Sequence, residues 1–290
     1  MAFETVENLK AFFRTLVYSG VVTAANALVP RGGYTLRKDV AYGDGARQML
    51  DVYVPDGLTA PAPVLFFFHG GSWQFGDKNQ YRALGQAFAS KGIVTVVANY
   101  GLFPPARFPR FIEDGARAFR YVHDHVREWG GDPARIFLCG HSAGAHIAAM
   151  LGTNGDYLRA AGSDPSAPRG IIGIAGPYDF LPIKDPVLID LFGGDNVPET
   201  QPITFVDGKR APMLLAHGRD DTTVGAGNSK RLAQKLQSFG SEVVVRYYHR
   251  TGHIGILLSL APGFRKRTTL YQDMLAFIAN PPSLKGRVGL

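Results

Sequence analysis

Short apolar runs alternate along this chain with longer segments in which apolar residues recur every three or four positions. Apolar runs bounded by turn residues predict buried strands, and the three-to-four spacing predicts helices with one buried face. We expect strands at residues 34–41, 48–54, 64–68, 93–98, 135–139, 171–175, 213–216 and 243–248. We expect helices at residues 81–90, 112–129, 145–151, 228–239 and 264–278.

The order of these elements indicates the fold class. Strands that alternate with helices are typical of an α/β protein with a mostly parallel, doubly wound sheet of about eight strands and helices on both faces. The first two strands are joined by the turn Gly43-Asp44-Gly45, which predicts a hairpin at the sheet edge. In such sheets ligands bind beyond the carboxyl ends of the strands. We therefore expect the functional residues directly after the strands.

Two segments lie outside this alternation. The stretch from Leu16 to Val29 is apolar, but polar residues interrupt it and it is shorter than the roughly 20 apolar residues of a membrane-spanning helix. We expect residues 1–30 to form a helical segment that packs on the body of the protein or acts as a lid. Residues 176–211 contain several prolines and little periodicity, which predicts a cap-like insertion in a domain that spans residues 31–290.

Composition and charge exclude further classes of function. Cys139 is the single cysteine, so no intrachain disulfide can form, and its place in an apolar run predicts a core residue. The formal charge is +7, but no basic cluster is as long as a nucleic-acid-binding tail. The chain contains no phosphate-binding loop, nucleotide fingerprint or metal-ligand motif. We expect no cofactor, metal, nucleic-acid partner or stable membrane span, a cytoplasmic location and a small-molecule substrate, with homodimer formation left open.

The pentapeptide Gly140-His141-Ser142-Ala143-Gly144 joins a predicted strand to a predicted helix. This G-x-S-x-G pattern is typical of a sharp turn in which both glycines avoid a clash and the serine hydroxyl is exposed. The free N–H groups and the positive dipole end of the following helix favour negative charge next to that hydroxyl. The pattern also occurs by chance in glycine-rich loops. Its position between a predicted strand and a predicted helix nevertheless makes Ser142 the predicted nucleophile.

A serine nucleophile needs an imidazole to take its proton and a carboxylate to orient that imidazole. His253 follows the last predicted strand on a loop flanked by glycines and is the predicted base, with His249 as the second candidate. Asp220 and Asp221 follow the preceding strand. Because neighbouring side chains on a tight turn diverge, only one of the two carboxylates can contact the histidine.

Acyl transfer also needs N–H donors at the position where the carbonyl oxygen becomes negative. A glycine-rich loop follows the apolar run at residues 64–68, and a helix begins after the predicted nucleophile. The backbone N–H groups of Gly71, Ser72 and Ala143 are the predicted donors of this oxyanion hole. We expect His69 to orient the loop through hydrogen bonds, because a second base would be redundant.

The strand ends carry a set of motifs, which are His69-Gly70-Gly71-Ser72-Trp73, Asn99-Tyr100, Gly130-Gly131-Asp132-Pro133, Gly140 to Gly144, His217-Gly218-Arg219-Asp220-Asp221 and Gly252-His253. Through these motifs the chain resembles the α/β-hydrolase family. The resemblance is to the branch of bacterial carboxylesterases related to hormone-sensitive lipase, arylformamidase and isoprenylcysteine methylesterase. It covers roughly residues 35 to 280 and implies the α/β-hydrolase fold.

The resemblance also bears on single residues. In that family the acid is usually the third residue after the His-Gly pair and a valine follows shortly, which favours Asp221, with Val224 after it. Ser72 stands where lipase-like members have a third glycine, which points to the formamidase and methylesterase side. Gly101 stands where relatives usually carry an arginine, which predicts the loss of a helix anchor.

Together these residues predict a serine carboxylic-ester hydrolase that acts through an acyl-enzyme on short-chain or aryl esters. Trp73, Phe103 and Tyr178 are the predicted substrate-binding residues, with Phe108 and Phe180 as further candidates for an apolar pocket. Two alternatives stay open. One is an arylformamidase or amidase with the same triad, and the other is a non-catalytic binding protein on the same fold.

Overall fold

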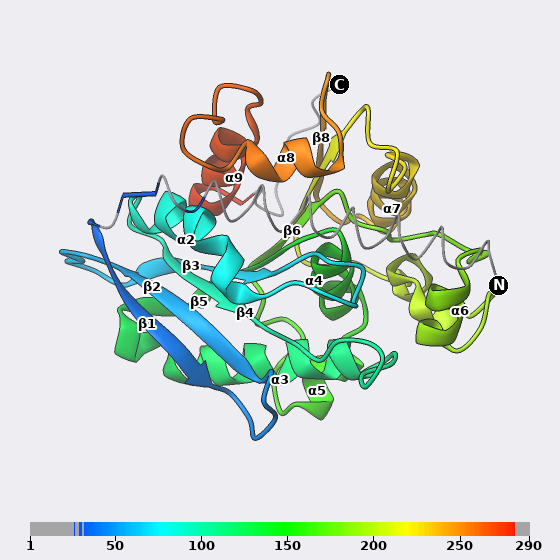
Figure 1. Cartoon of the computed structure of the whole chain (residues 1–290), viewed down its shortest axis with the longest axis horizontal. Coiled ribbons are helices and arrows are strands. Elements are labelled where there is room, and N and C mark those ends of the chain that lie inside the picture. The colour runs from blue at the N-terminus through cyan, green and yellow to red at the C-terminus, as the bar shows by residue number, and fades with distance from the viewer. Residues whose placement is uncertain (1–25, 27–28, 31, 282–290) are drawn as a thin grey trace, which may run out of the picture.

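An eight-stranded sheet forms the centre of the molecule (Figure 1). The structure, a computed structural model, describes residues 26, 29–30 and 32–281, so most of the expected N-terminal helix lies outside the described residues. The strand order is β1 (Tyr34–Ala41), β2 (Met49–Pro55), β4 (Val94–Ala98), β3 (Ala62–Phe68), β5 (Gly131–His141), β6 (Gly170–Ile174), β7 (Met213–Gly218) and β8 (Val243–Tyr248).

The strand directions confirm the expected sheet. β1 pairs antiparallel with β2, and β2 pairs antiparallel with β4. All further neighbours, from β4 through β3 to β8, are parallel. The predicted hairpin is therefore the edge of an otherwise parallel sheet. The carboxyl ends of the parallel strands meet at one edge, where the chemistry-bearing motifs follow them.

Helices cover both faces of the sheet (Figure 1). One face shares an apolar core with α3 (Arg110–His125), α4 (Ala143–Thr153), α5 (Asp156–Ala160), α6 (Pro186–Phe192) and α7 (Gly227–Ser238). The other face packs against α2 (Arg82–Ala89), α8 (His253–Leu258) and α9 (Leu270–Ala279). Successive strand residues point to opposite faces, so Phe66 and Phe68 join the first core and Leu65 and Phe67 the second.

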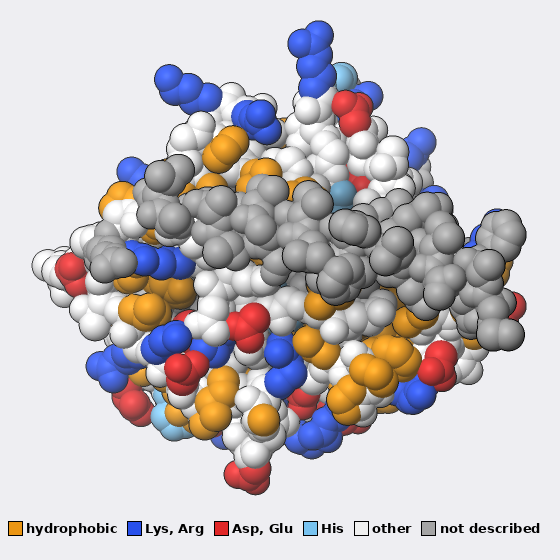
Figure 2. Space-filling view, in the orientation of Figure 1, with side chains coloured by type: hydrophobic (Ala, Val, Ile, Leu, Met, Phe, Trp, Pro, Cys, Tyr) orange, Lys and Arg blue, Asp and Glu red, His pale blue; other side chains and the backbone are white. Residues whose placement is uncertain are grey.

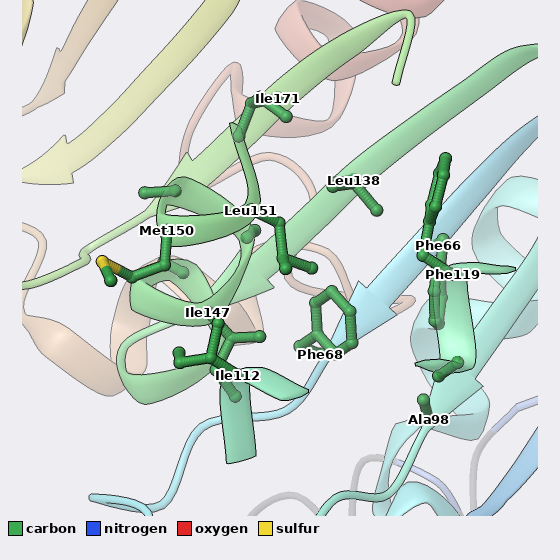
Figure 3. Close-up of a cluster of buried hydrophobic side chains, with 14 of the residues drawn as sticks. Phe66, Phe68, Ala98, Ile112, Phe119, Leu138, Ile147, Met150, Leu151 and Ile171 are labelled. Atoms are coloured by element: carbon green, nitrogen blue, oxygen red, sulfur yellow. The ribbon is translucent and has the colours of Figure 1, made fainter. Parts of the chain in front are cut away.

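The first core holds α4 against the sheet. Figure 3 shows Ile147 and Leu151 of α4 facing Phe68 and Leu138 from the central strands. All four side chains are at most 1% exposed. Each fully buried side chain of this kind contributes about 1.5–3 kcal/mol relative to an exposed one. The N-terminus of α4, which begins directly after Ser142, is thereby fixed to the central strands.

Some helices differ from the sequence-based expectation. The helix expected at residues 112–129 is α3 followed by the 3₁₀ turn η2 (Val126–Trp129), and the last helix begins only at Leu270. The short helices α5, α6 and α8 were not predicted, because two turns or fewer carry no readable periodicity. Residues 176–211 contain α6 and the 3₁₀ turns η3 (Pro198–Thr200) and η4 (Pro202–Phe205); their role as a cap stays a prediction.

The loop after β4 keeps an anchor to α3 without an arginine at residue 101. The Gly101 N–H donates to the Asp114 carboxylate of α3 at 2.9 Å, and the side-chain amide of Gln48 donates to its other oxygen at 2.8 Å. The loop therefore contacts α3 through its backbone, and the loss of a side-chain anchor at residue 101 stays a prediction.

The face of the molecule seen in Figure 2 carries charges of both signs. Figure 2 shows Lys and Arg side chains scattered over the visible face and interspersed with acidic ones, not gathered into one basic patch. Within the described residues, no helix has both the length and the apolar character that a membrane crossing requires.

Candidate active site

Ser142 lies at a sharp turn that requires glycine at both Gly140 and Gly144. β5 ends at His141, α4 begins at Ala143, and Ser142 between them has φ 56° and ψ −119°. A Cβ on Gly140 would lie 2.1 Å from the backbone of Gly144, and a Cβ on Gly144 would lie 2.0 Å from the Phe68 carbonyl oxygen. Neither contact is possible for a side chain, so both glycines are required for the strand to turn directly into the helix.

A hydrogen-bonded chain of three side chains starts at this serine. The Nε2 atom of His253 lies 2.9 Å from the Ser142 hydroxyl, and its Nδ1 atom lies 2.7 Å from the Asp221 carboxylate. His253 stands at the first position of α8 instead of on the expected loop, with Gly252 before it in extended conformation. His249, the second candidate, is exposed. The structure thus brings together three residues that are 32 and 111 positions apart.

The Asp221 carboxylate is held in its charged form. One of its oxygens accepts the backbone N–H groups of Thr223 and Val224, both at 2.9 Å. Burial opposes the charge, but hydrogen bonds from His217 and His253 outweigh it and hold the pKa of Asp221 well below its usual value. Its neighbour Asp220 is exposed. Asp221, and not Asp220, is therefore the carboxylate that can stabilise a positive charge on His253.

His217 supports the same carboxylate, a contact that the sequence did not reveal. Its Nε2 atom lies 2.8 Å from the Val224 carbonyl and 3.4 Å from the Asp221 carboxylate. A carbonyl only accepts, so Nε2 carries the hydrogen and Nδ1 accepts from the Ser229 hydroxyl at 2.8 Å. The position of His217-Gly218 at a strand end indicated that His217 lies near the site. Its contacts could not be predicted, because Val224 and Ser229 come from the following turn and helix.

The predicted oxyanion loop lies against the nucleophile. A Cβ on Gly70 would lie 3.3 Å from the Ser142 Cβ. Gly71, Ser72 and Trp73 all have positive φ, at 126°, 50° and 58°. Three such residues in succession coil the backbone tightly, and positive φ is strained for the two that carry side chains.

Hydrogen bonds to the carbonyl groups of Gly70 and Gly71 fix the peptide planes of this loop and thereby the directions of its N–H groups. His69 Nδ1 lies 2.8 Å from the Gly70 oxygen, and the Gly71 oxygen accepts N–H groups from Gln74 and Phe75 at 2.9 and 3.0 Å. In a trans peptide the N–H points opposite to the carbonyl. The Gly71 and Ser72 N–H groups therefore point away from these partners, and no described residue accepts from either of them.

The Ala143 N–H completes the predicted set of donors. It is the first N–H of α4 and has no acceptor among the described residues. The first N–H groups of a helix lack an intrahelical partner, and the helix dipole makes this end attractive to negative charge. The N–H groups of Gly71, Ser72 and Ala143 therefore have no acceptor among the described residues, and their joint role as oxyanion donors stays a prediction.

The predicted substrate-binding residues differ in their exposure. Trp73 is 4% exposed and Phe103 is half-buried, and the Phe103 N–H donates to the Trp73 oxygen at 2.8 Å. Tyr178 is fully buried and packs over the backbone of Gly173 and Gly176. Contact with a substrate stays a prediction for all three residues, and for Tyr178 it would require the surrounding side chains to move.

An aromatic cluster surrounds Trp73. Its ring lies 4.9 Å from Phe192, 5.2 Å from His146 and 6.3 Å from Phe180, measured between ring centroids. His146 belongs to α4, one turn after the nucleophile, and Phe180 follows β6. An aromatic cluster therefore packs around the end of the oxyanion loop and the first turn of α4.

Buried neutral histidines make the stability of this region depend on pH. Burial lowers the pKa of His146 to about 4, against 6.5 for an exposed histidine, and its Nε2 lies 2.8 Å from the Thr200 carbonyl. Below pH 6.5 the unfolded chain therefore binds a proton that the folded protein does not. The contribution of neutral His146 is complete above pH 6.5 and is lost as the pH falls toward 4.

We expect His146→Gln to weaken the acid sensitivity of folding. Between pH 7 and pH 4.5, wild type should lose about 2 kcal/mol more unfolding free energy than the variant, because one titrating group is removed. Urea unfolding of both proteins at the two pH values measures this difference. Equal losses in the two proteins would contradict the assignment of a buried neutral imidazole.

Comparison with known proteins gives consistent matches. Residues 50–236, more than half of the chain, match the family model described as BD-FAE. The chain is 27% identical over 265 residues to isoprenylcysteine alpha-carbonyl methylesterase ICME of Arabidopsis thaliana, covering 84% of this chain and 62% of that protein. It is 27% identical over 245 residues to kynurenine formamidase of Salmo salar, covering 82% and 81%.

Solved structures show the same fold. An inhibited esterase B from Lactobacillus rhamnosis matches with a TM-score of 0.78 at 20% identity, covering 93% of this chain and 95% of that one. This similarity confirms the α/β-hydrolase fold. The chain spans 52–63% of the length of four plant isoprenylcysteine methylesterases that it matches.

Proposed function

The chain belongs to the BD-FAE family, and we propose that it is a serine carboxylic-ester hydrolase acting on short-chain or aryl esters. The observation that carries the proposal is the unbroken hydrogen-bonded chain from Ser142 through His253 to Asp221. The family match, the isoprenylcysteine methylesterase relatives and the fold shared with esterases support it.

In the first half of the proposed reaction, His253 transfers a proton from Ser142 to the leaving alcohol. The Ser142 Oγ attacks the ester carbonyl while Nε2 of His253 takes its proton, and Asp221 stabilises the resulting imidazolium through Nδ1. The carbonyl oxygen becomes negative and accepts hydrogen bonds from the backbone of the oxyanion loop and the start of α4. Collapse of this intermediate expels the alcohol, which receives the proton from His253 and leaves an acyl-serine.

The second half of the reaction repeats these steps with water. His253 takes a proton from water, which attacks the acyl carbon, and then returns a proton to Ser142 as the carboxylic acid leaves. The residues themselves supply nucleophile, base, acid and oxyanion donors, and we propose no cofactor or metal. Asp221 stays charged throughout, in agreement with its low pKa.

The aromatic residues beside the oxyanion loop support an apolar acyl or aryl group in the substrate. Trp73 and Phe103 adjoin the oxyanion loop, and the Trp73 ring packs against Phe180 at 6.3 Å. Aromatic side chains form the walls of many small-molecule sites. A small-molecule ester is the proposed partner. A cytoplasmic location and homodimer formation stay predictions.

Two experiments test the function. An organophosphonate probe should label the native protein at Ser142, and mass spectrometry of peptides locates the label. A series of p-nitrophenyl esters with acyl chains of increasing length should be hydrolysed, with the short chains fastest. Absence of both labelling and turnover would overturn the proposal in favour of a binding protein on the hydrolase fold.

A second candidate function is hydrolysis of N-formyl arylamines. It is favoured by the kynurenine formamidase match, which covers 81% of that protein, a larger share than the 52–63% of the plant methylesterases. The same nucleophile, base and oxyanion donors would act on an amide. Paired kinetics on an aryl ester and the matching formanilide separate the two, and faster turnover of the formanilide would replace the esterase proposal.

A further inference from the structure

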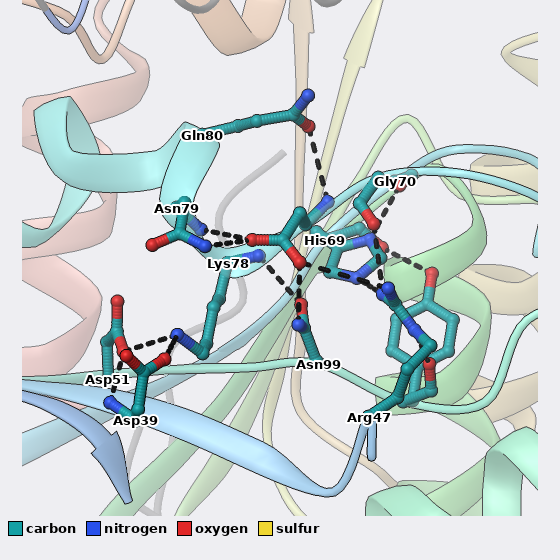
Figure 4. Close-up of polar contacts among 12 residues, drawn as sticks. Asp39, Arg47, Asp51, His69, Gly70, Lys78, Asn79, Gln80 and Asn99 are labelled. Atoms are coloured by element: carbon teal, nitrogen blue, oxygen red, sulfur yellow. Dashed lines mark hydrogen bonds and ion pairs between the residues drawn. The ribbon is translucent and has the colours of Figure 1, made fainter.

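Arg47 contacts the back of the oxyanion loop from a distant part of the chain. It lies in the connection between β1 and β2, and its side chain is 32% exposed. Its Nε donates to the Tyr100 carbonyl at 2.7 Å, and one terminal nitrogen donates to the Gly76 carbonyl at 2.9 Å. The same nitrogen lies 3.4 Å from Nε2 of His69 (Figure 4). One guanidinium therefore joins the loop after β4 to both ends of the oxyanion loop.

The contact between Arg47 and His69 determines where the imidazole carries its hydrogen. A guanidinium has donors only, so the Nε2 atom of His69 must accept. The hydrogen of the neutral ring is then on Nδ1, which donates to the Gly70 carbonyl at 2.8 Å. Burial lowers the pKa of His69 to about 4, so the ring is neutral near pH 7.

The contact between Arg47 and His69 also affects the Gly71 N–H, because the Gly70 carbonyl that His69 holds lies in the same peptide plane. The Gly70 carbonyl and the Gly71 N–H belong to the same trans peptide and point in opposite directions. Holding the Gly70 oxygen on His69 therefore aims the Gly71 N–H away from the loop interior. The Gly70 N–H is also held, since it donates to the Tyr81 hydroxyl at 3.3 Å.

A network of side chains holds this loop from behind. The Arg47 guanidinium lies 3.8 Å from the Asp77 carboxylate, which accepts from the Asn99 amide at 2.8 Å. The Asn99 side-chain oxygen accepts the Lys78 N–H at 2.7 Å, and Nζ of Lys78 donates to the buried Asp51 carboxylate at 2.7 Å (Figure 4). These contacts fix the residues that follow Gly76, so Arg47 bonds to a carbonyl that cannot move freely.

We propose that Arg47 is a positioning residue of the oxyanion hole, which acts through His69 and the Gly70 carbonyl on the Gly71 N–H. This inference rests on the proposed hydrolase function. Arg47 contacts the oxyanion loop but not Ser142. Its effect should therefore appear in stabilisation of the transition state and not in binding of the ground state.

The test compares substrate turnover with the affinity for an oxyanion-forming inhibitor. We expect Arg47→Met to lower kcat for p-nitrophenyl butyrate by about 10–100-fold with KM changed less than about 3-fold, because a misplaced donor costs on this scale. An aryl trifluoromethyl ketone forms a serine adduct that carries an oxyanion, and its inhibition constant should rise by a similar factor. A merely structural role would leave this inhibition constant unchanged.

Arg210→Met is the matched control. Arg210 is also partly exposed, at 23%, and donates to the carbonyl groups of Thr153 and Phe205 at 2.9 and 2.7 Å, remote from the oxyanion loop. Its loss should lower the thermal midpoint and leave kcat within about 2-fold. This control separates the loss of a buried arginine contact from the loss of oxyanion positioning.

The outcomes distinguish this inference from the proposed function. An active wild type with unchanged kcat and inhibitor affinity in Arg47→Met would overturn the role of Arg47 and leave the function intact. A wild type that hydrolyses no ester or formanilide would overturn the function instead. If Arg47→Met does not fold, Arg47→Lys decides, since it keeps the charge but not the forked donor set. Unchanged kcat in that variant would also overturn the inference.

Discussion

Ser142→Ala is expected to lower kcat for ester hydrolysis by about 10⁶-fold, since removal of the serine nucleophile eliminates the acyl-enzyme route altogether. Activity that remains comes from the oxyanion donors and from binding alone. The folded structure should change little, because the alanine keeps the same Cβ in the turn and Ser142 is only 9% exposed. The measurement is initial rates on p-nitrophenyl butyrate with thermal unfolding as a parallel control.

The organophosphonate probe gives an independent readout of the same variant. Wild type should be labelled at Ser142, and the alanine variant should not be labelled there. A variant that keeps more than about 1% of the wild-type kcat would contradict a nucleophilic role, because the expected loss is orders of magnitude larger. Unchanged thermal unfolding is required for either conclusion.

Asp221→Asn is expected to lower kcat by about 10⁴-fold. Asparagine preserves the size of the side chain and can still accept the N–H groups of Thr223 and Val224 through its oxygen. Its amide group would then face His253, and an amide N–H next to Nδ1 favours the imidazole tautomer with the hydrogen on Nε2. That tautomer cannot take the proton of Ser142, so the loss is in kcat.

Asp220→Asn is the matched control, since it makes the same chemical change one residue earlier. The Asp220 side chain is exposed, and its backbone N–H donates to the Thr251 carbonyl at 3.1 Å, a contact that the substitution keeps. Its kcat should stay within about 2-fold of wild type. If Asp220→Asn were the damaging substitution, the acid would be assigned to the wrong residue.

The sequence predicted the sheet because its strands follow from local patterns, and the structure brings the predicted triad side chains within hydrogen-bond distance. Apolar runs marked the buried parallel strands, and the turn at residues 43–45 marked the more polar hairpin strand at the sheet edge. The glycines of the elbow belong to a five-residue motif whose steric reason is local. Asp221 was preferred over Asp220 through a family pattern, and the structure shows the physical basis in its backbone donors at Thr223 and Val224.

Contacts between distant segments could not be predicted in the same way. Arg47 reaches His69 across 22 positions, and His217 meets Ser229 across 12, and neither pair belongs to a motif with fixed spacing. The helix that begins at His253 has six residues, too few to show periodicity. These features depend on the packing of complete elements, which a single sequence does not encode in readable form.

The close approach of Gly144 to Phe68 has a consequence for directed evolution. A side chain at Gly144 would lie within 2.0 Å of the backbone of the neighbouring strand, so libraries that randomise this position would consist largely of unfolded protein. Phe103 and Phe180 are half-buried and pack against the first core. A library limited to these aromatic positions would vary the predicted walls of the site while the turn that carries Ser142 stays constant.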